Sequence, residues 1–146
     1  MLEMPLPTFL HMPMGFDVYI GRAHQVIQQL GMQEKWPGLY LTSTGWFKGK
    51  ILAPLVDGKS PSRHVIHLPR PFEFYVRLHH GGIGTMKSTL KEMQAELFDA
   101  GRMPKEMFMA HLTCPNCAEE RGGEKILMFR RWEHSPTLAR RMKNRE

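Results

Sequence analysis

The stretch that decides the fold is FEFYVRLHHGGIGTMKSTLKEMQAELFDAG, residues 72–101. Apolar and polar side chains alternate over its first seven residues, which predicts a half-buried strand over 72–78. A glycine-rich turn follows. Apolar residues then recur at helical spacing and predict a helix over 86–100, with Thr85 as its N-cap and Gly101 at its end. This part of the chain is therefore predicted to be a strand–turn–helix unit.

The remaining segments show weaker patterns of the same kind. Helical spacing predicts a short helix over 24–32, and apolar runs predict strands over 39–42, 107–112 and 126–132. We expect an α+β fold with a small mixed sheet, two helices, a C-terminal CxxC hairpin and extended termini.

The predicted domain organisation has three parts. Three prolines among isolated apolar residues predict an extended Pro- and Met-rich arm over 1–16, because proline removes a hydrogen-bond donor and excludes helix. A single α+β domain is expected over 17–132, with the CxxC hairpin at 107–132. A basic tail is expected over 133–146.

Composition and charge narrow the class of protein. The 146 residues carry a net charge of +6 and the sequence has a pI of about 9.6, which favours an anionic partner. No run approaches the ~18 apolar residues of a membrane span, and the N-terminus lacks the features of a secretory signal. The two cysteines stand in CxxC spacing, which indicates metal or redox use in a reducing compartment rather than a disulfide framework.

The motif Cys114-Pro-Asn-Cys117 is the candidate metal site. Two thiolates on a tight turn can approach one zinc ion, and His111 and His134 are the candidate further ligands. Zinc is therefore the candidate cofactor. Two alternatives remain open: a metal-free knuckle that braces the hairpin, and a thiol–disulfide site, against which Gly122-Gly123 argues because such sites begin a helix.

The loop GGIGTMKS, residues 81–88, lies between the predicted strand and helix. Amides at the start of a helix, together with Lys87, can bind an anion such as an RNA phosphate, and a plain tight turn is the alternative. The loop does not fit the P-loop pattern. His79 and His80 are interpreted as surface or core histidines. Because the chain shows neither HExxH nor a Ser-His-Asp order, we expect no enzyme.

Basic and aromatic residues interleave at 46–50 and 129–132, and a further group of basic residues ends the chain. This mixture suits RNA, because cations meet phosphates and rings stack on splayed bases. A strand with one solvated face is the alternative. The candidate RNA-binding residues are Lys48, Lys50, Lys87, Arg130, Arg131, Arg140, Arg141, Lys143 and Arg145.

Residues 20–56 contain a set of short motifs that resemble one family. Ile20-Gly21-Arg22 would match a turn and Leu30-Gly31 the end of a helix, while Lys35, the strand 39–41, Thr44 and Lys48-Gly49 would match later positions. In this respect the segment, about a quarter of the chain, resembles the L-thirty family of large-subunit ribosomal proteins. It departs from the family pattern at Ser43, Gly45 and Pro54. The resemblance implies a divergent organellar ribosomal protein.

These observations lead to one expected function and two alternatives. We expect a non-catalytic structural subunit of a large assembly, namely a mitochondrial ribosomal large-subunit protein whose partners are rRNA and neighbouring proteins. The alternatives are an accessory subunit of a mitochondrial respiratory complex and a small zinc-knuckle regulator that binds one protein. The expected location is mitochondrial, with a cytoplasmic location as the alternative.

Overall fold

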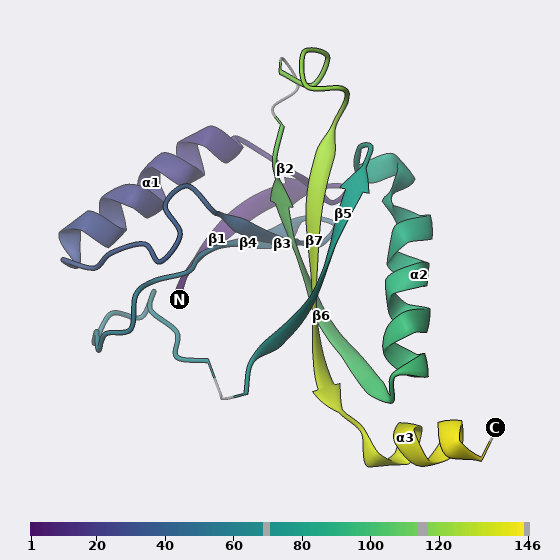
Figure 1. Ribbon diagram of the computed structural model, residues 1–146. Helices are drawn as coiled ribbons and strands as arrows, with labels where there is room; N and C mark the ends of the chain where they lie inside the picture. The colour runs from purple at the N-terminus through teal and green to yellow at the C-terminus, as the bar shows by residue number, and fades with distance from the viewer. Residues whose placement is uncertain (69–70, 114–116, 145–146) are drawn as a thin grey trace. The chain divides into compact units, whose positions relative to one another are not determined.

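The computed structural model describes residues 1–68, 71–113 and 117–144 (Figure 1). It is a mixed α/β structure with antiparallel strands and, among the described residues, three α-helices. The predicted combination of helices and sheet is therefore confirmed, whereas the predicted number of helices is wrong. The chain divides into two compact units, Met1–Arg70 and Pro71–Glu146.

The first unit is a small antiparallel sheet with one helix. Its elements are β1 (Leu2–Phe9), β2 (Met12–Pro13), α1 (Phe16–Gln29), β3 (Leu41–Thr44) and β4 (Lys48–Ala53). The strand β1 lies between β2 and β4, and β3 pairs with the other edge of β4. Every one of these pairings is antiparallel, whereas a mixed sheet was expected.

The helix α1 begins much earlier than the sequence predicted. A helix was expected over 24–32, but residues from Phe16 onward are helical. The physical reason is the spacing of Tyr19, Ala23 and Ile27, which places one apolar side chain on the same face at every fourth position. This face packs on β1 and β4, and its contacts outweigh the modest helix propensity of the β-branched residues in the first turns.

The core of the first unit lies between α1 and the sheet. Leu2, Leu6 and Ile51 have at most 1% of their surface exposed, and Ala23 and Ile27 of α1 pack against them. Complete burial of one such large side chain contributes about 1.5–3 kcal/mol. The start of the chain is thus extended, as expected, but as a paired strand that supplies part of the core.

The second unit is a three-stranded antiparallel sheet covered by one long helix. Its elements are β5 (Glu73–His80), the 3₁₀ turn η1 (Ile83–Thr85), α2 (Met86–Asp99), β6 (Arg102–His111), β7 (Lys125–His134) and α3 (Pro136–Lys143). The strand β7 lies between β6 and β5. The predicted strand–turn–helix unit over 72–101 is present with nearly the predicted limits.

The core of the second unit consists mainly of methionine. Met93 of α2 packs against Met109, Ile126 and Met128 of the sheet, and none of the four has more than 4% of its surface exposed. The unbranched thioether side chain fits irregular gaps between helix and sheet. This packing holds α2 along the face of the sheet formed by β5, β6 and β7 (Figure 1).

The helix α3 corrects the expectation of an extended C-terminus. Pro136 occupies its first turn, and the Ser135 side chain accepts a hydrogen bond from the backbone amide of Leu138, so the start of the helix is capped. No helix in the described part of the chain is long and apolar enough to cross a membrane.

Two predictions about organisation remain open. The CxxC tip of the β6–β7 hairpin includes residues 114–116, which lie outside the described residues, so the tip stays a prediction. The expected division into an arm over 1–16, a domain over 17–132 and a tail over 133–146 concerns independent folding and also stays a prediction.

Candidate active site

A buried histidine lies where β5 meets the start of α2. His79 is only 6% exposed, although it is a polar residue near the end of a strand. The alternation of side chains along β5 directs it to the face that α2 covers, on the same side as Tyr75 and Arg77. A buried imidazole needs hydrogen-bond partners, because an unsatisfied buried polar group costs about 1–3 kcal/mol.

Both ring nitrogens of His79 have a hydroxyl partner. Nε2 lies 3.0 Å from the Thr85 Oγ1 atom, and Nδ1 lies 2.8 Å from the Thr89 Oγ1 atom. The Thr85 hydroxyl also donates to the Gly82 carbonyl oxygen over 3.1 Å. In this arrangement Nε2 carries the proton and donates to Thr85, while Thr89 donates to Nδ1. If Thr85 turns its proton toward Nε2, the other tautomer is satisfied equally well, because a hydroxyl both donates and accepts.

The glycine turn brings the hydroxyl of Thr85 to the histidine. Gly81 has φ +135°, and a Cβ atom at this position would lie 2.5 Å from Thr85 Oγ1 and 3.1 Å from His79 Nε2. A side chain here would therefore displace one of the two hydrogen-bonded groups. Glycine is required at this position both for the backbone conformation and for the close approach.

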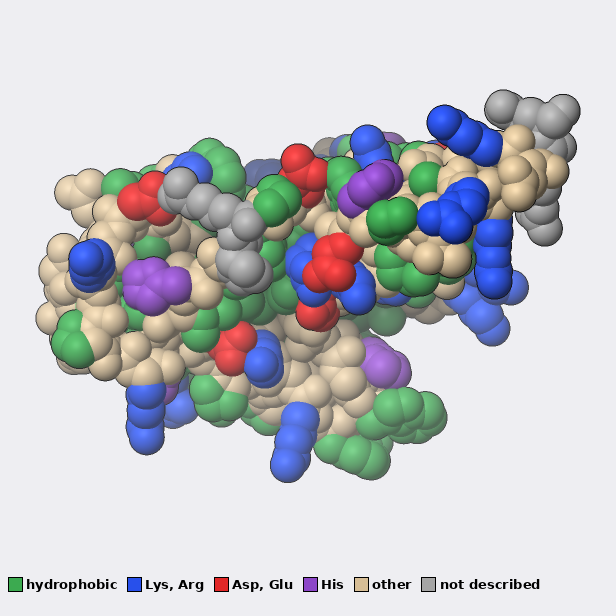
Figure 2. Space-filling view, turned by 90° about the horizontal axis from the view of Figure 1, so that it is seen from below, with side chains coloured by type: hydrophobic (Ala, Val, Ile, Leu, Met, Phe, Trp, Pro, Cys, Tyr) green, Lys and Arg blue, Asp and Glu red, His purple; other side chains and the backbone are tan. Residues whose placement is uncertain are grey.

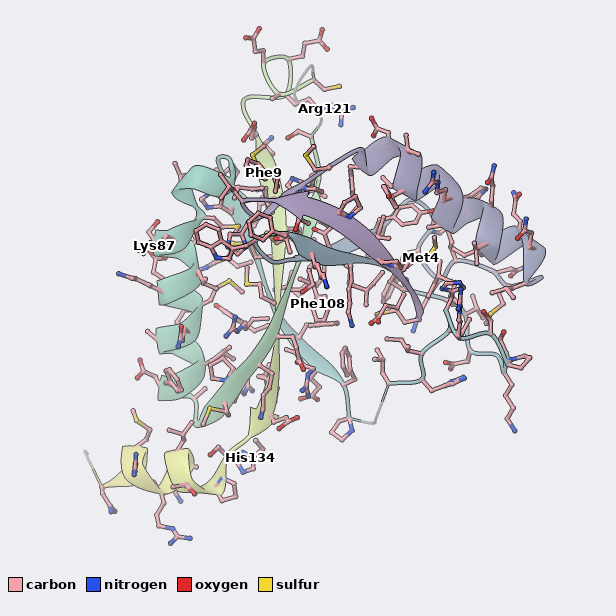
Figure 3. The ribbon with its side chains drawn as sticks, turned by 180° about the vertical axis from the view of Figure 1, so that it is seen from behind. Met4, Phe9, Lys87, Phe108, Arg121 and His134 are labelled. Carbon is pink, nitrogen blue, oxygen red and sulfur yellow. The ribbon has the colours of Figure 1, made fainter. Side chains whose placement is uncertain are left out.

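The solvent side of this site is the first turn of α2. Thr85, Lys87 and Ser88 are exposed, and Figure 3 shows the Lys87 side chain reaching outward from the helix. Among the described residues no side chain caps α2, and the helix dipole adds partial positive charge at this end. The Thr85 hydroxyl, which is hydrogen-bonded to the buried His79, therefore lies at a helix terminus that favours negative charge.

Ion pairs hold α2 over β5 beside the histidine. The Arg77 guanidinium lies 2.9 Å from a carboxylate oxygen of Glu92 and 2.9 Å from one of Glu96. The Tyr75 hydroxyl donates to Glu96, and this hydrogen bond raises the pKa of Tyr75. Arg77 is half-buried but both carboxylates are exposed, so each ion pair contributes at most about 1 kcal/mol. Their role is to fix α2, which carries Thr89 and directly follows Thr85.

A second histidine, in the first unit, is held by a carboxylate. His24 Nδ1 lies 3.0 Å from Glu34 Oε1, and its Nε2 lies 3.0 Å from the side-chain nitrogen of Gln28. The Glu34 side chain is 9% exposed and also accepts hydrogen bonds from the Tyr40 hydroxyl and the Gly38 amide. Burial raises the pKa of Glu34, but its hydrogen bonds from His24, Gly38 and Tyr40 outweigh that effect and leave the pKa below its usual value. The pair resembles the orienting half of a catalytic triad.

The structure does not bring the two predicted histidine ligands together. His134 pairs with Arg102 at one end of the β6–β7 hairpin, whereas His111 pairs with Ile126 toward the other end. The strand rise makes that separation roughly 30 Å. Figure 3 likewise shows His134 at one end of the hairpin and Arg121 at the other. His134 and His111 therefore cannot ligate the same ion.

The rest of the zinc prediction remains untested. Cys114 lies outside the described residues, and Cys117 lies in the turn beyond β6. Within the described ranges, no three His, Cys, Asp or Glu residues are placed to hold a metal ion. Burial lowers the pKa of His111, so this imidazole is neutral at pH 7.

The predicted RNA-binding residues are distributed over several elements. Lys48 and Lys50 lie in β4, and the Lys50 ammonium is 2.8 Å from Glu3. Arg131 in β7 is bound by the carboxylates of Glu106 and Glu133, which raise its pKa. The others lie at the start of α2, in β7 and in the last turn of α3, apart from Arg145, which is outside the described residues. RNA binding by these residues remains a prediction.

Sequence reasoning missed the partners of His79. Thr85 was expected only as an N-cap, His79 only as a surface or core histidine, and Thr89 was not singled out. The only local signal is that His79 ends a strand and is followed by a glycine turn and by two threonines four residues apart, because the apolar alternation along β5 places His79 on the opposite face. The pair formed by His24 and Glu34 gives no such local signal, since the two stand ten positions apart with no recognisable pattern between them.

Comparison with known proteins gives one match. A family model described as "Bacterial hydrolase" matches residues 2–131. No curated protein and no solved structure matches the chain.

This match corrects the functional predictions. It contradicts the resemblance to the L-thirty ribosomal family and the expected role as a ribosomal subunit, and nothing in it supports the respiratory-complex or zinc-knuckle alternatives. The expectation that the chain is not an enzyme is wrong, because the matched family is one of hydrolases. The predicted partners, zinc and location are not tested by the match.

Proposed function

Because the chain belongs to the bacterial hydrolase family, we propose that it is a hydrolase in which the exposed Thr85 hydroxyl is the nucleophile and the buried His79 is its general base. The observation that carries the proposal is the pair of contacts made by the His79 ring, 3.0 Å to Thr85 and 2.8 Å to Thr89. A nucleophile within hydrogen-bond reach of a base, with the base oriented by a third group, is the general arrangement for covalent catalysis.

The proposed reaction has two half-steps that use the same base. The reaction starts from the tautomer of His79 that carries its proton on Nδ1 and donates it to Thr89, so that Nε2 can accept a proton. In the first half-step, Thr85 Oγ1 bonds to the carbonyl carbon of an ester while its proton passes to His79 Nε2. The bond from carbon to the leaving alcohol then breaks, and the alcohol takes that proton. In the second, water attacks the acyl-threonine, gives a proton to Nε2, and the acid leaves as the proton returns to Thr85. Thr89 holds the ring through Nδ1 during both steps.

The surroundings of Thr85 suit this chemistry. The tetrahedral intermediate carries a negative oxygen, and the first turn of α2 with Lys87 favours negative charge beside the nucleophile. Such charge stabilisation is often the largest single contribution to the rate. Positioned acid–base catalysis typically contributes a further 10²–10⁴-fold, roughly. An ester whose carbonyl can reach the exposed Thr85 is the substrate class that this arrangement favours.

The pair formed by His24 and Glu34 is the second candidate for the reacting centre. The specific observation in its favour is the carboxylate at Nδ1, which orients the ring. His24 is also more accessible, with 55% of its side chain exposed. A histidine held in this way can activate water directly. This candidate needs no covalent intermediate on the protein.

The two candidates are separated by activity measurements on the purified full chain. The substrates are p-nitrophenyl acetate and, for comparison, p-nitrophenyl phosphate. If Thr85 is the nucleophile, Thr85→Val and His79→Gln each lower the esterase rate by about 10²-fold or more. Thr85→Ser retains activity because it keeps the hydroxyl. Mass spectrometry of acid-quenched protein finds an added acetyl group on the peptide that contains Thr85.

His80→Gln is the matched control, because His80 is the next residue along β5 but is exposed and points to the opposite face. Its rate should equal that of the unmodified protein. If Thr85→Val keeps the full rate while His24→Gln loses it, the second candidate is correct and the proposal for Thr85 is wrong.

A further inference from the structure

Two neighbouring turns of the first unit carry a group of exposed apolar side chains. We call this group the apolar tip; its members are Phe9, Leu10, Met12, Met14, Trp46 and Phe47, with 50–66% of each side chain exposed. Exposed apolar residues scattered singly are normal, but a contiguous group marks an interaction site. Hydrophobic side chains are visible on the face drawn in Figure 2, and Figure 3 shows Phe9 at the end of β1 far from Met4.

Hydrogen bonds fasten the two turns to one another. The Leu10 amide donates to the Trp46 carbonyl oxygen over 2.9 Å, and the Thr8 hydroxyl donates to the Gly45 carbonyl oxygen over 2.8 Å. The aromatic rings are also close, because the Phe9 and Phe47 centroids lie 6.4 Å apart. The apolar tip is therefore a preformed surface and not a set of independent loose side chains.

The turn between β1 and β2 holds its apolar residue in an unfavourable conformation. Leu10 has φ +48° and His11 has φ +67°, a region that suits glycine or asparagine and disfavours larger side chains. The His11 ring lies 5.7 Å from the Trp46 ring, and its Nδ1 atom is 3.2 Å from the Thr44 carbonyl oxygen. An unfavourable backbone held in place at an exposed apolar turn is typical of a functional surface.

The charge around the apolar tip indicates what it binds. The turn segments 9–14 and 45–48 contain Lys48 but no aspartate or glutamate. Lys50 follows along β4, where its ammonium is 2.8 Å from Glu3. Aromatic side chains with flanking lysines suit the boundary between the headgroups and the acyl chains of an anionic bilayer. A lipid surface also accepts two projecting turns without a complementary cavity, which a protein partner would have to supply.

We propose that the apolar tip inserts Trp46, Phe47 and the β1–β2 turn into the surface of an anionic lipid bilayer. This function goes beyond the proposed hydrolysis. Its test does not depend on catalytic activity, so a negative result for lipid binding leaves the proposed hydrolysis unaffected, and the reverse also holds.

The test measures binding of the full chain to vesicles of phosphatidylcholine with phosphatidylserine, and to vesicles of phosphatidylcholine alone. Co-sedimentation and a blue shift of tryptophan fluorescence are the two readouts. We expect binding to the phosphatidylserine vesicles that weakens as salt is added. The double variant Trp46→Ser/Phe47→Ser should bind at least about tenfold more weakly, because two large apolar side chains no longer leave water.

Trp36→Ser is the matched control, since Trp36 is 55% exposed but lies outside the tip; its binding should be unchanged. Circular dichroism confirms that both variants are folded. Equal binding of the double variant and the Trp36→Ser control to the vesicles would overturn the proposal, because vesicle binding would then depend on the net charge of the protein and not on the apolar tip. Self-association that requires Trp46 and Phe47, without vesicle binding, would also overturn it and assign the tip to a second copy of the chain.

Discussion

Replacing Gly81 with alanine tests the geometry around His79 most directly. The new Cβ atom would lie 2.5 Å from Thr85 Oγ1, so the Thr85 hydroxyl has to move away from the ring. The φ angle of +135° adds backbone strain of about 1–3 kcal/mol for any residue other than glycine. Loss of one hydrogen bond to a buried imidazole adds about 1–3 kcal/mol. We expect Gly81→Ala to lower the free energy of unfolding by about 2–6 kcal/mol.

The same glycine turn provides the control for this variant. A Cβ atom on Gly84 would meet no other atom within 4 Å, and the φ angle of Gly84 is not positive. Gly84→Ala should therefore change the free energy of unfolding by less than about 0.5 kcal/mol. Urea unfolding followed by circular dichroism measures both variants. The ¹⁵N chemical shifts of the His79 ring report whether Nε2 has lost its partner.

Activity gives the second readout of this comparison. If Thr85 reacts through His79, Gly81→Ala should lose esterase activity even under conditions where most of the protein is folded, while Gly84→Ala keeps it. Two results would refute the reasoning: equal stability of the two alanine variants, or an unchanged ¹⁵N spectrum of His79 in Gly81→Ala.

Three further predictions concern parts of the chain outside this turn. The pKa of Glu34 is lowered in the folded protein, so its carboxylate stabilises the fold above the usual pKa of about 4.3. This contribution is lost as the pH falls through the lowered pKa. Glu34→Gln should therefore be less stable than the unmodified protein at pH 7, and acid-unfolding curves should show the difference shrinking as the pH falls. Met128→Ala should cost about 2–5 kcal/mol in urea unfolding, since the side chain is fully buried, whereas exposed Met103→Ala should cost almost nothing. Ser135→Ala should remove the cap of α3 and lower the helical circular dichroism signal at a cost of about 1 kcal/mol; an unchanged signal would show that the cap is not needed.

The sequence predicted the segment 72–101 well because its signals are local. Alternation along β5, the glycine turn and the helical spacing of α2 each act within a few residues, and each sets its own limits. The structure agrees to within about two residues at these ends, which is the usual spread of helix boundaries.

Tertiary contacts explain the main errors in the fold. Helix α3 is short and polar, so its sequence resembles a solvated tail, and only its cap at Ser135 gives a local signal. In β5 the face that packs on α2 is the one with Tyr75, Arg77 and His79, although the apolar alternation suggested the opposite face. Ion pairs from Glu92 and Glu96 satisfy the polar groups there, which a single strand cannot reveal.

The candidate site could be predicted only in part. The glycine turn and Lys87 were recognised as a place where an anion could bind, but the contact of His79 with Thr85 and Thr89 depends on how α2 folds back over β5. The hydrolase assignment itself rests on the family match over residues 2–131. No spacing of residues along the chain indicated catalysis.

The methionines of this protein differ in how readily an oxidant can reach them. Exposed Met12 and Met14 are open to peroxide in the folded state, whereas the thioethers of Met93 and Met128 are shielded from it by their burial. Conversion of either core methionine to its polar sulfoxide would disrupt the packing of α2 on the sheet. The core side chains therefore react only when that packing opens, and their rate of oxidation measures how often the second unit opens.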